Sequence, residues 1–290
     1  MNKLFRLSPI CAIVVVFAAF SLASAQTYTS VDFPGATATT LNGGPNPQGT
    51  SVGTETDAAG VIHGFTLNRN GAFTVFDPPG STATTPNFIS PQGTIVGGYL
   101  DAGGVSHGFI LSGGQYTTLD FPGAAGTQLT GINPSGEISG FSCAVASCAT
   151  RPFHSFTVSK HGDFTSFDPP GAVSSSASTV NPAGAVVGAY TDAAGKSHGY
   201  ILYHGTFVTD DFPGSIFTFN GGNNPEGDIV GAWIDTAGVV HGFLLRNGTF
   251  TSFDFPGATL TDPTGINPGG TIVGVYNDAA GNGHGFIRTP

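Results

Sequence analysis

Short stretches of alternating apolar and polar residues recur along the chain, and glycine, proline, asparagine or aspartate bounds each one. Near the C-terminus, residues 260–266, 271–276 and 284–288 are rich in β-branched and aromatic residues. This pattern predicts three strands, with turns between them in which glycine supplies the positive φ that tight turns need. Earlier units add a fourth strand, such as residues 249–255 after the hairpin signal Asn247-Gly248.

Three sequence markers each recur six times. The first is a His-Gly-Phe-like triplet with spacings of 43 to 47 residues, at His63, His107, His154, His198, His241 and His284. The second is Asp-Phe/Pro-Pro-Gly, at Asp32, Asp77, Asp120, Asp168, Asp211 and Asp254. The third is a proline followed by glycine two residues later, at Pro47, Pro91, Pro134, Pro182, Pro225 and Pro268. Such periodicity is the signature of a repeat architecture.

The last repeat ends at Pro290, after its third strand, and a matching fourth strand stands at residues 28–33. A ring of four-stranded blades would use this N-terminal strand to complete the last blade, which removes an exposed sheet edge. We therefore predict an all-β fold, a six-bladed β-propeller in which residues 26–290 form one domain of six repeats of about 43 residues. An open β-repeat array and a pair of β-domains are the alternatives.

The repeat unit resembles the extracellular HAF family, named after a His-Ala-Phe triplet. The residues that carry the resemblance include Gly265–Pro268, Ile272–Gly274 and His284–Phe286, and the similarity extends over all six repeats. In this chain the middle residue of the triplet is glycine or serine, never alanine. The resemblance implies export and β-repeats, and it implies no catalytic residue because the family has no assigned activity.

Residues 1–25 have the features of a signal peptide. Lys3 and Arg6 precede an apolar run at residues 10–20, and Ala23-Ser24-Ala25 forms a small-residue cleavage site. No second hydrophobic segment of spanning length follows, so we expect no membrane span after cleavage. The mature protein is predicted to be secreted or periplasmic.

The mature chain is strongly acidic. All 18 acidic residues but only six of the eight Lys and Arg lie beyond residue 25, so the mature net charge is 6 − 18 = −12. Nucleic acid is excluded as an expected partner because phosphate binding needs basic residues. Polysaccharides and proteins remain candidate ligands.

Two cysteines remain after residue 25, Cys143 and Cys148. In an oxidising compartment the default state of such a pair is a disulfide. The pair stands where the other repeats have a simple turn between the second and third strands. Insertions on a repeat scaffold often lie on a binding face, although a tolerated, decorated turn is the simpler interpretation.

The six repeated histidines are predicted to be structural. Each would lie on the third strand of a different blade, too far from the others to share one metal ion. We expect each imidazole to bond a neighbouring group within its own blade.

The repeated aspartates form two sets. One is the Asp-Phe/Pro-Pro-Gly set, and the other lies in the turn after the second strand, at Asp57, Asp101, Asp192, Asp235 and Asp278. Turn formation explains both sets, because aspartate accepts hydrogen bonds from nearby backbone N–H groups. The eleven residues would lie on one rim of a propeller, so Ca²⁺ binding there is a second hypothesis. No cofactor is otherwise expected.

Residues outside the repeat pattern are the better candidates for a unique site. They are His161, Asp163, Tyr203, His204, Asp210, Glu226, Asp228, Trp233 and Asp262. No nucleophile elbow, phosphate loop or zinc motif occurs in the chain. We therefore expect a non-enzymatic extracellular binding module or scaffold. The alternatives are a secreted carbohydrate-active hydrolase or lyase with its site at the channel, and a calcium-stabilised cell-envelope protein.

Overall fold

The computed structural model describes residues 26–290, and every regular element in this range is a β-strand. The predicted signal peptide, residues 1–25, lies outside the described residues. Between residues 26 and 290 there is no helix that could cross a membrane. The prediction of an all-β fold is confirmed.

The strands form four-stranded antiparallel groups, which we call blades. The first, innermost strands are β2 (Ala38–Gly43), β6 (Ala83–Ile89), β10 (Gly126–Ile132), β14 (Ala172–Val180), β18 (Phe217–Asn223) and β22 (Leu260–Ile266). The second strands are β3 (Ser51–Thr56), β7 (Ile95–Leu100), β11 (Ile138–Cys143), β15 (Val186–Asp192), β19 (Ile229–Ile234) and β23 (Ile272–Asn277). The third strands are β4 (Ile62–Leu67), β8 (Ser106–Ser112), β12 (Phe153–Val158), β16 (Ser197–Tyr203), β20 (Val240–Arg246) and β24 (Gly283–Thr289). The outer strands are β5 (Phe73–Phe76), β9 (Gln115–Thr118), β13 (Phe164–Phe167), β17 (Thr206–Thr209), β21 (Thr249–Phe253) and β1 (Thr27–Val31).

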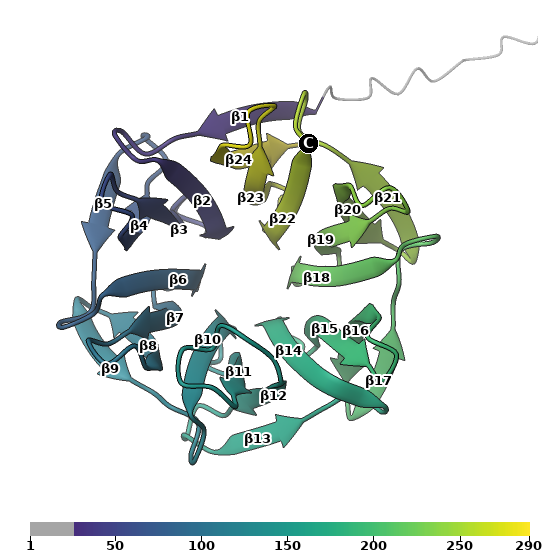
Figure 1. Cartoon of the computed structure of the whole chain (residues 1–290), viewed down its shortest axis with the longest axis horizontal. Helices are drawn as coiled ribbons and strands as arrows, with labels where there is room; N and C mark the ends of the chain where they lie inside the picture. The colour runs from purple at the N-terminus through teal and green to yellow at the C-terminus, as the bar shows by residue number, and fades with distance from the viewer. Residues whose placement is uncertain (1–25) are drawn as a thin grey trace, which may run out of the picture.

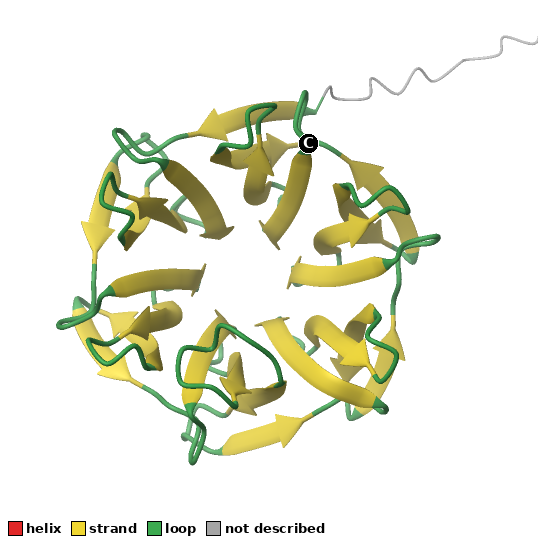
Figure 2. Ribbon diagram, in the orientation of Figure 1, coloured by secondary structure: helices red, strands yellow, loops and turns green. Residues whose placement is uncertain are grey.

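The blades stand around a central opening, with the innermost strands facing it (Figure 1). The blades β2–β5, β6–β9 and β10–β13 are separate sheets. The other three are joined into one twelve-stranded sheet by single parallel bridges, Ser197 with Phe217 and Val240 with Leu260. Loops and turns connect the strands within and between the blades (Figure 2). This arrangement is that of a β-propeller.

The first strand of the chain completes the last blade. Strand β1 pairs antiparallel with β24, from Thr27 opposite Thr289 to Val31 opposite Gly285. The two ends of the described chain therefore lie side by side at the outer edge of the ring (Figure 1). This is the pairing that the unmatched N-terminal strand predicted.

The aromatic residue of each repeated triplet forms the core. Its side chain is fully buried in every repeat, at Phe65, Phe109, Phe156, Tyr200, Phe243 and Phe286. The second strand presents a glycine beneath this ring. A Cβ on Gly274 would lie 2.3 Å from the Asp262 carbonyl oxygen and 2.7 Å from the Phe286 ring. Glycine at this position therefore lets the aromatic ring pack against the strand.

Adjacent blades are joined by apolar packing and by side-chain hydrogen bonds. Val273 of β23 packs with Leu41 and Phe65 of the neighbouring blade. Polar side chains of the innermost strands donate to carbonyls of the next blade, Asn42 to Pro86 at 2.9 Å and Thr264 to Leu41 at 2.8 Å. These contacts set the positions of the innermost strands around the central opening.

Candidate functional site

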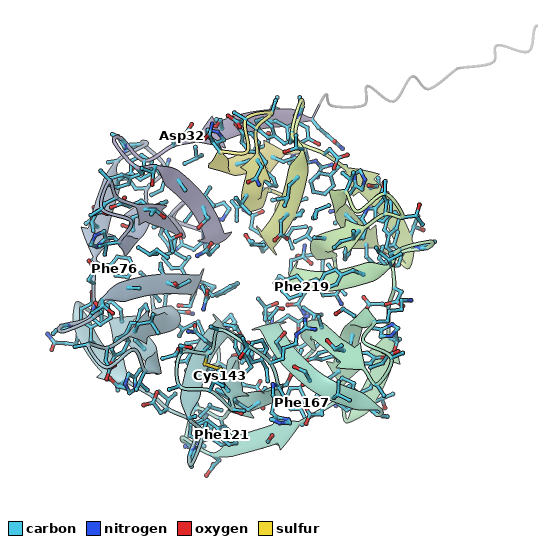
Figure 3. The ribbon with its side chains drawn as sticks, in the orientation of Figure 1. Asp32, Phe76, Phe121, Cys143, Phe167 and Phe219 are labelled. Atoms are coloured by element: carbon cyan, nitrogen blue, oxygen red, sulfur yellow. A yellow bond between two sulfur atoms is a disulfide. The ribbon has the colours of Figure 1, made fainter. Side chains whose placement is uncertain are left out.

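A cavity of about 670 Å³ lies at the axis of the ring, between the innermost strands. Its lining includes the innermost-strand residues Gln128, Phe219 and Asp262, and also Arg151 from the connection between β11 and β12. The side chain of Phe219 belongs to β18, beside the central opening (Figure 3). Arg151 places the cavity at the end of the ring where the second and third strands are connected.

The opposite end of the channel is narrow and apolar. A cavity of about 100 Å³ there is lined by the prolines of the turns between first and second strands, Pro45, Pro47, Pro91, Pro134, Pro182, Pro225 and Pro268. These rigid turns close around the axis and leave room for a ligand only at the wider end.

The wall of the wide cavity differs from blade to blade. In each blade a glycine of the second strand pairs with a residue of the innermost strand. In five blades the residue directly before this paired residue lines the cavity: Thr85, Gln128, Ser176, Phe219 and Asp262. This level of the wall therefore holds one carboxylate and one aromatic ring among hydroxyl and amide groups. A repeat scaffold here presents a unique set of side chains.

Asp262 supplies the carboxylate of this wall, and its side chain makes no hydrogen bond to any described residue. Its Oδ1 atom is buried, while the residue as a whole keeps partial exposure at the cavity. Burial raises the pKa of Asp262 to about 6. The only basic residue of the lining, Arg151, instead donates to Thr191 Oγ1 and, at 3.4 Å, to Ser197 Oγ.

Aromatic side chains line two further sides of the cavity. Phe141 and Phe153 lie with their ring centroids 4.9 Å apart, and Phe217 and Phe219 lie on β18, two blades further around the ring. The cavity therefore combines apolar faces with hydrogen-bonding groups, which is the composition of ligand-binding pockets.

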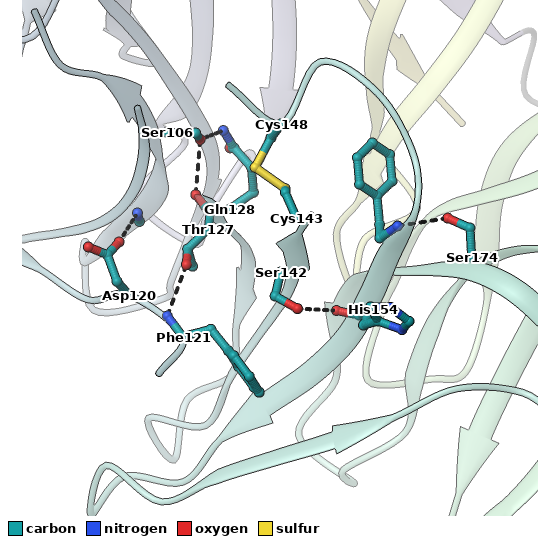
Figure 4. The surroundings of a disulfide bond; sticks show 12 residues. Ser106, Asp120, Phe121, Thr127, Gln128, Ser142, Cys143, Cys148, His154 and Ser174 are labelled. Atoms are coloured by element: carbon teal, nitrogen blue, oxygen red, sulfur yellow. Dashed lines mark hydrogen bonds between the residues drawn. A yellow bond between two sulfur atoms is a disulfide. The ribbon is translucent and has the colours of Figure 1, made fainter. Parts of the chain in front are cut away.

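The predicted disulfide is confirmed: Cys143 and Cys148 are bonded, with 5.2 Å between their Cα atoms (Figure 4). The connection between β11 and β12, whose first part the disulfide closes, contacts both neighbouring blades. The Ser106 N–H donates to the Ala146 carbonyl at 2.7 Å on one side, and Arg151 donates to Thr191 on the other. Through Arg151 this connection forms part of the rim of the wide cavity.

The six repeated histidines bond within their own blades. The Nδ1 atom of each lies 2.5 to 2.9 Å from the aspartate of the Asp-Phe/Pro-Pro-Gly marker, in the pairs His63–Asp77, His107–Asp120, His154–Asp168, His198–Asp211, His241–Asp254 and His284–Asp32. The last pair joins the first strand of the chain to the last blade, and Asp32 lies at the outer edge of the ring (Figure 3).

The second set of aspartates lies on the other side of the same imidazoles. Their Oδ2 atoms are 3.3 to 3.8 Å from Nε2 in five blades, in the pairs Asp57–His63, Asp101–His107, Asp192–His198, Asp235–His241 and Asp278–His284. Their Oδ1 atoms accept backbone N–H groups two and four residues on, as at Asp57 from Ala59 and Val61. The cystine loop replaces this aspartate in the third repeat. In residues 26–290 no group of three or more His, Cys, Asp and Glu is arranged to hold a metal ion.

These contacts shift the pKa values in opposite directions. The hydrogen bonds that His63 and His284 donate to Asp77 and Asp32 raise the pKa values of these two histidines. Burial alone would lower the pKa values of His107 and His241, but their aspartate partners outweigh it and raise them. Backbone N–H donors, such as Val61 at Asp57, lower the pKa values of Asp57, Asp101, Asp192 and Asp235. Hydrogen bonds from Asn282 lower the pKa of Asp278 to about 2.

The other residues outside the repeat pattern lie apart from the cavity lining. His161, Asp163, Tyr203, His204 and Glu226 are exposed. Asp228 pairs with Arg246 at 2.7 Å, and Trp233 stacks on Phe212 with 4.1 Å between centroids. Asp210 accepts from Asn220, and burial raises its pKa to about 7. Of the residues singled out in the sequence, the structure brings only Asp262 into the cavity wall.

Sequence analysis missed the aromatic and amide part of the cavity. Gln128, Phe217 and Phe219 are not among the candidate residues that the sequence pattern indicates. A usable signal was present, because Phe219 and Gln128 stand where other repeats have Thr or Ser. Large side chains at an inner-strand position occupied by small residues elsewhere indicate a unique wall.

No family model and no curated protein matches the chain. Solved structures do match it. Aleuria aurantia lectin, described as a six-bladed β-propeller with a novel fucose recognition mode, is 12% identical with a TM-score of 0.53, over 89% of this chain and 93% of that one. A gluconolactonase from Xanthomonas campestris is 12% identical with a TM-score of 0.55, over 88% of each chain. TolB from Acinetobacter baumannii is 12% identical with a TM-score of 0.57, over 79% of this chain and 60% of that one.

These similarities identify the chain as a β-propeller. The matched proteins include a lectin, an enzyme and TolB, and at this level of identity the likeness concerns the fold alone. The function has to be argued from the cavity.

Proposed function

We propose that residues 26–290 form a single six-bladed β-propeller domain that is exported and acts as a non-enzymatic binding module for extracellular glycans. The observation that carries this proposal is the wide cavity of about 670 Å³ at the axis of the ring. Its volume is that of a small-ligand pocket. Its wall combines the rings of Phe217 and Phe219 with the hydroxyl groups of Thr85 and Ser176, which suits the apolar faces and hydroxyl groups of a sugar.

Two further observations support the proposal. The apolar run at residues 10–20 and the resemblance to HAF repeats favour export. The lectin match shows that a propeller of this shape can carry sugar-binding sites. A protein ligand would need a larger and more open surface than the cavity provides.

Hydrolysis is less well supported than binding. Glycosidases use two carboxylates on either side of the bond that they cleave. Among the described residues that line the cavity, Asp262 is the only carboxylate. We therefore favour a binding site over a hydrolase site at this position.

Isothermal titration calorimetry with neutral oligosaccharides tests the proposal. We expect a subset to bind the 26–290 protein, and we expect Phe219→Ala to weaken binding by roughly tenfold or more, as loss of a central aromatic contact does. Tyr203→Ala is the matched control, because Tyr203 is an exposed aromatic residue outside the cavity lining. The absence of binding to every oligosaccharide, or equal losses in both variants, would contradict the proposal.

A further inference from the structure

The carboxylate of Asp262 has no counter-charge. Arg151 is the only Lys or Arg among the described residues of the cavity lining, and its guanidinium donates to Thr191 and Ser197 of the neighbouring blade. No hydrogen-bond donor of the described residues reaches the carboxylate of Asp262. A desolvated carboxylate without a partner is unfavourable, so this position destabilises the empty protein.

The two oxygen atoms of Asp262 differ in access. Oδ1 is buried, whereas the remaining exposure of the residue faces the cavity. A carboxylate shares its charge over both oxygens, so a cation at Oδ2 would compensate the charge that the protein leaves unpaired. Among the described residues that line the cavity, Arg151 and Asp262 are the only titratable groups.

Asp262 also has a suitable neighbour. Phe219 stands at the corresponding position of the adjacent innermost strand, where the other blades have Thr, Ser or Gln. Carboxylates and aromatic faces are the two groups that attract ammonium ions in proteins. The excess of acidic residues in the mature chain favours the approach of a cationic ligand.

We propose that the central cavity selects glycans that carry a free amine, and that the ammonium group of an amino sugar lies against Asp262 Oδ2. This inference rests on the proposed function, since it assigns the ligand class of the same cavity. The pKa of about 6 that burial gives Asp262 agrees with this assignment. An ammonium group stabilises the ionised form of Asp262, so binding of the amine releases the proton that the free protein holds below that pH.

The test compares two glycan probes with the same backbone, a tetramer of glucosamine and a tetramer of N-acetylglucosamine. Their dissociation constants are measured by calorimetry at pH 6 on the 26–290 protein, on Asp262→Asn and on Asp163→Asn. The last variant is the matched control, because it removes one negative charge from an exposed residue outside the cavity. Asp262→Asn should fold, since it removes an unpaired buried charge, and thermal unfolding verifies this.

The wild-type protein and Asp163→Asn should bind the free-amine tetramer roughly tenfold or more tightly than the acetylated tetramer, which is the effect of one hydrogen bond to a charged group. In Asp262→Asn this ratio should fall to about one, while the acetylated tetramer still binds. Equal affinities in the wild-type protein, or a ratio that survives in Asp262→Asn, would overturn the inference and leave the proposed function intact. Failure of both tetramers and of all neutral oligosaccharides to bind would overturn both.

Discussion

Five of the six repeated imidazoles lie between carboxylates that belong to different connections, and the exception is His154 in the blade with the cystine loop. In the last blade His284 contacts Asp32 from the start of the chain and Asp278 from the turn between β23 and β24. A neutral imidazole can donate from only one of its nitrogen atoms, whereas the protonated ring can donate from both. The protonated state therefore joins the two connections of the blade more strongly.

This geometry predicts how stability depends on pH. Four of the repeated histidines have raised pKa values: His63, His107, His241 and His284. Their contribution to the stability of the fold is complete below the ordinary histidine pKa of about 6.5, and it is lost as the pH rises through their pKa values in the folded protein. Asp278, whose pKa is lowered, contributes to stability above about pH 3.9, and this contribution is lost as the pH falls through its pKa in the folded protein. We expect the melting temperature to be highest between about pH 4 and 6.5. Thermal unfolding from pH 3 to 9 measures this.

A single variant connects this profile to the histidines. His241→Ala should lower the melting temperature at pH 5.5 by roughly 2–4 °C, the effect of about 1 kcal/mol in a domain of this size, and by less at pH 8.5. The control is His161→Ala, since His161 is exposed in the turn between β12 and β13. A wild-type melting temperature that rises between pH 6 and 8 would contradict the interpretation.

At the scale of elements, ring closure depends on the short strand β1. It pairs with β24 over Thr27–Val31, buries Val31 and accepts a hydrogen bond from Tyr276 Oη to Ser30 at 2.9 Å. Without β1 the third strand of the last blade would become an exposed edge, and exposed edges pair with other chains.

Deletion of residues 26–33 tests this role. We expect the truncated protein to melt at least roughly 10 °C lower, or to aggregate, because it loses a whole strand and part of a core cluster. A synthetic peptide of residues 26–36 should restore stability in proportion to its concentration. The control is Ser30→Ala, which removes the hydroxyl that bonds Asp32 and Tyr276 and leaves the strand. A truncated protein that is monomeric and has the same melting temperature as the full-length protein would show that β1 is dispensable.

The elements were largely predictable from the sequence, because each strand carries its own local signals. The predicted strand 260–266 coincides with β22. The predicted strand 28–33 ends earlier, at Val31, because Asp32 turns to bond His284 and the Phe33 N–H donates to Thr39 Oγ1. Such tertiary hydrogen bonds leave no mark in the local pattern.

The cavity was predictable only in part. Asp262 stood out because it breaks the repeat, but its neighbours at the axis did not. Phe217 and Phe219 both line the cavity and alternate with the buried Thr218 and Asn220, as in an ordinary strand. Alternation shows that the two rings share one face of the strand, but it does not show that this face looks onto the axis.

At the scale of the whole molecule, the repeats are regular where they build the ring and irregular where they line the cavity. The histidine and aspartate pairs recur in every blade, whereas Asp262, Phe219 and the cystine loop each occur once. The repeated acids are therefore best explained as connections within blades, and the single features as the binding site.

This division leads to a prediction about calcium. A Ca²⁺ ion needs six to eight oxygen ligands, but the Oδ1 atoms of the turn aspartates already accept backbone N–H groups and an imidazole stands between the paired carboxylates. We therefore expect the melting temperature to be the same, within about 1 °C, in about 5 mM CaCl₂, MgCl₂ or EDTA at equal ionic strength.

The experiment separates specific binding from charge screening. A site with a dissociation constant of about 0.05 mM would add about 2.7 kcal/mol at 5 mM Ca²⁺, which corresponds to several degrees. Screening of the acidic surface would act equally in CaCl₂ and MgCl₂, so MgCl₂ is the control. A rise that is specific to Ca²⁺ and abolished by EDTA would show that the repeated aspartates are ligands. The hydrogen bonds between the imidazoles and carboxylates would then have to rearrange when the ion binds.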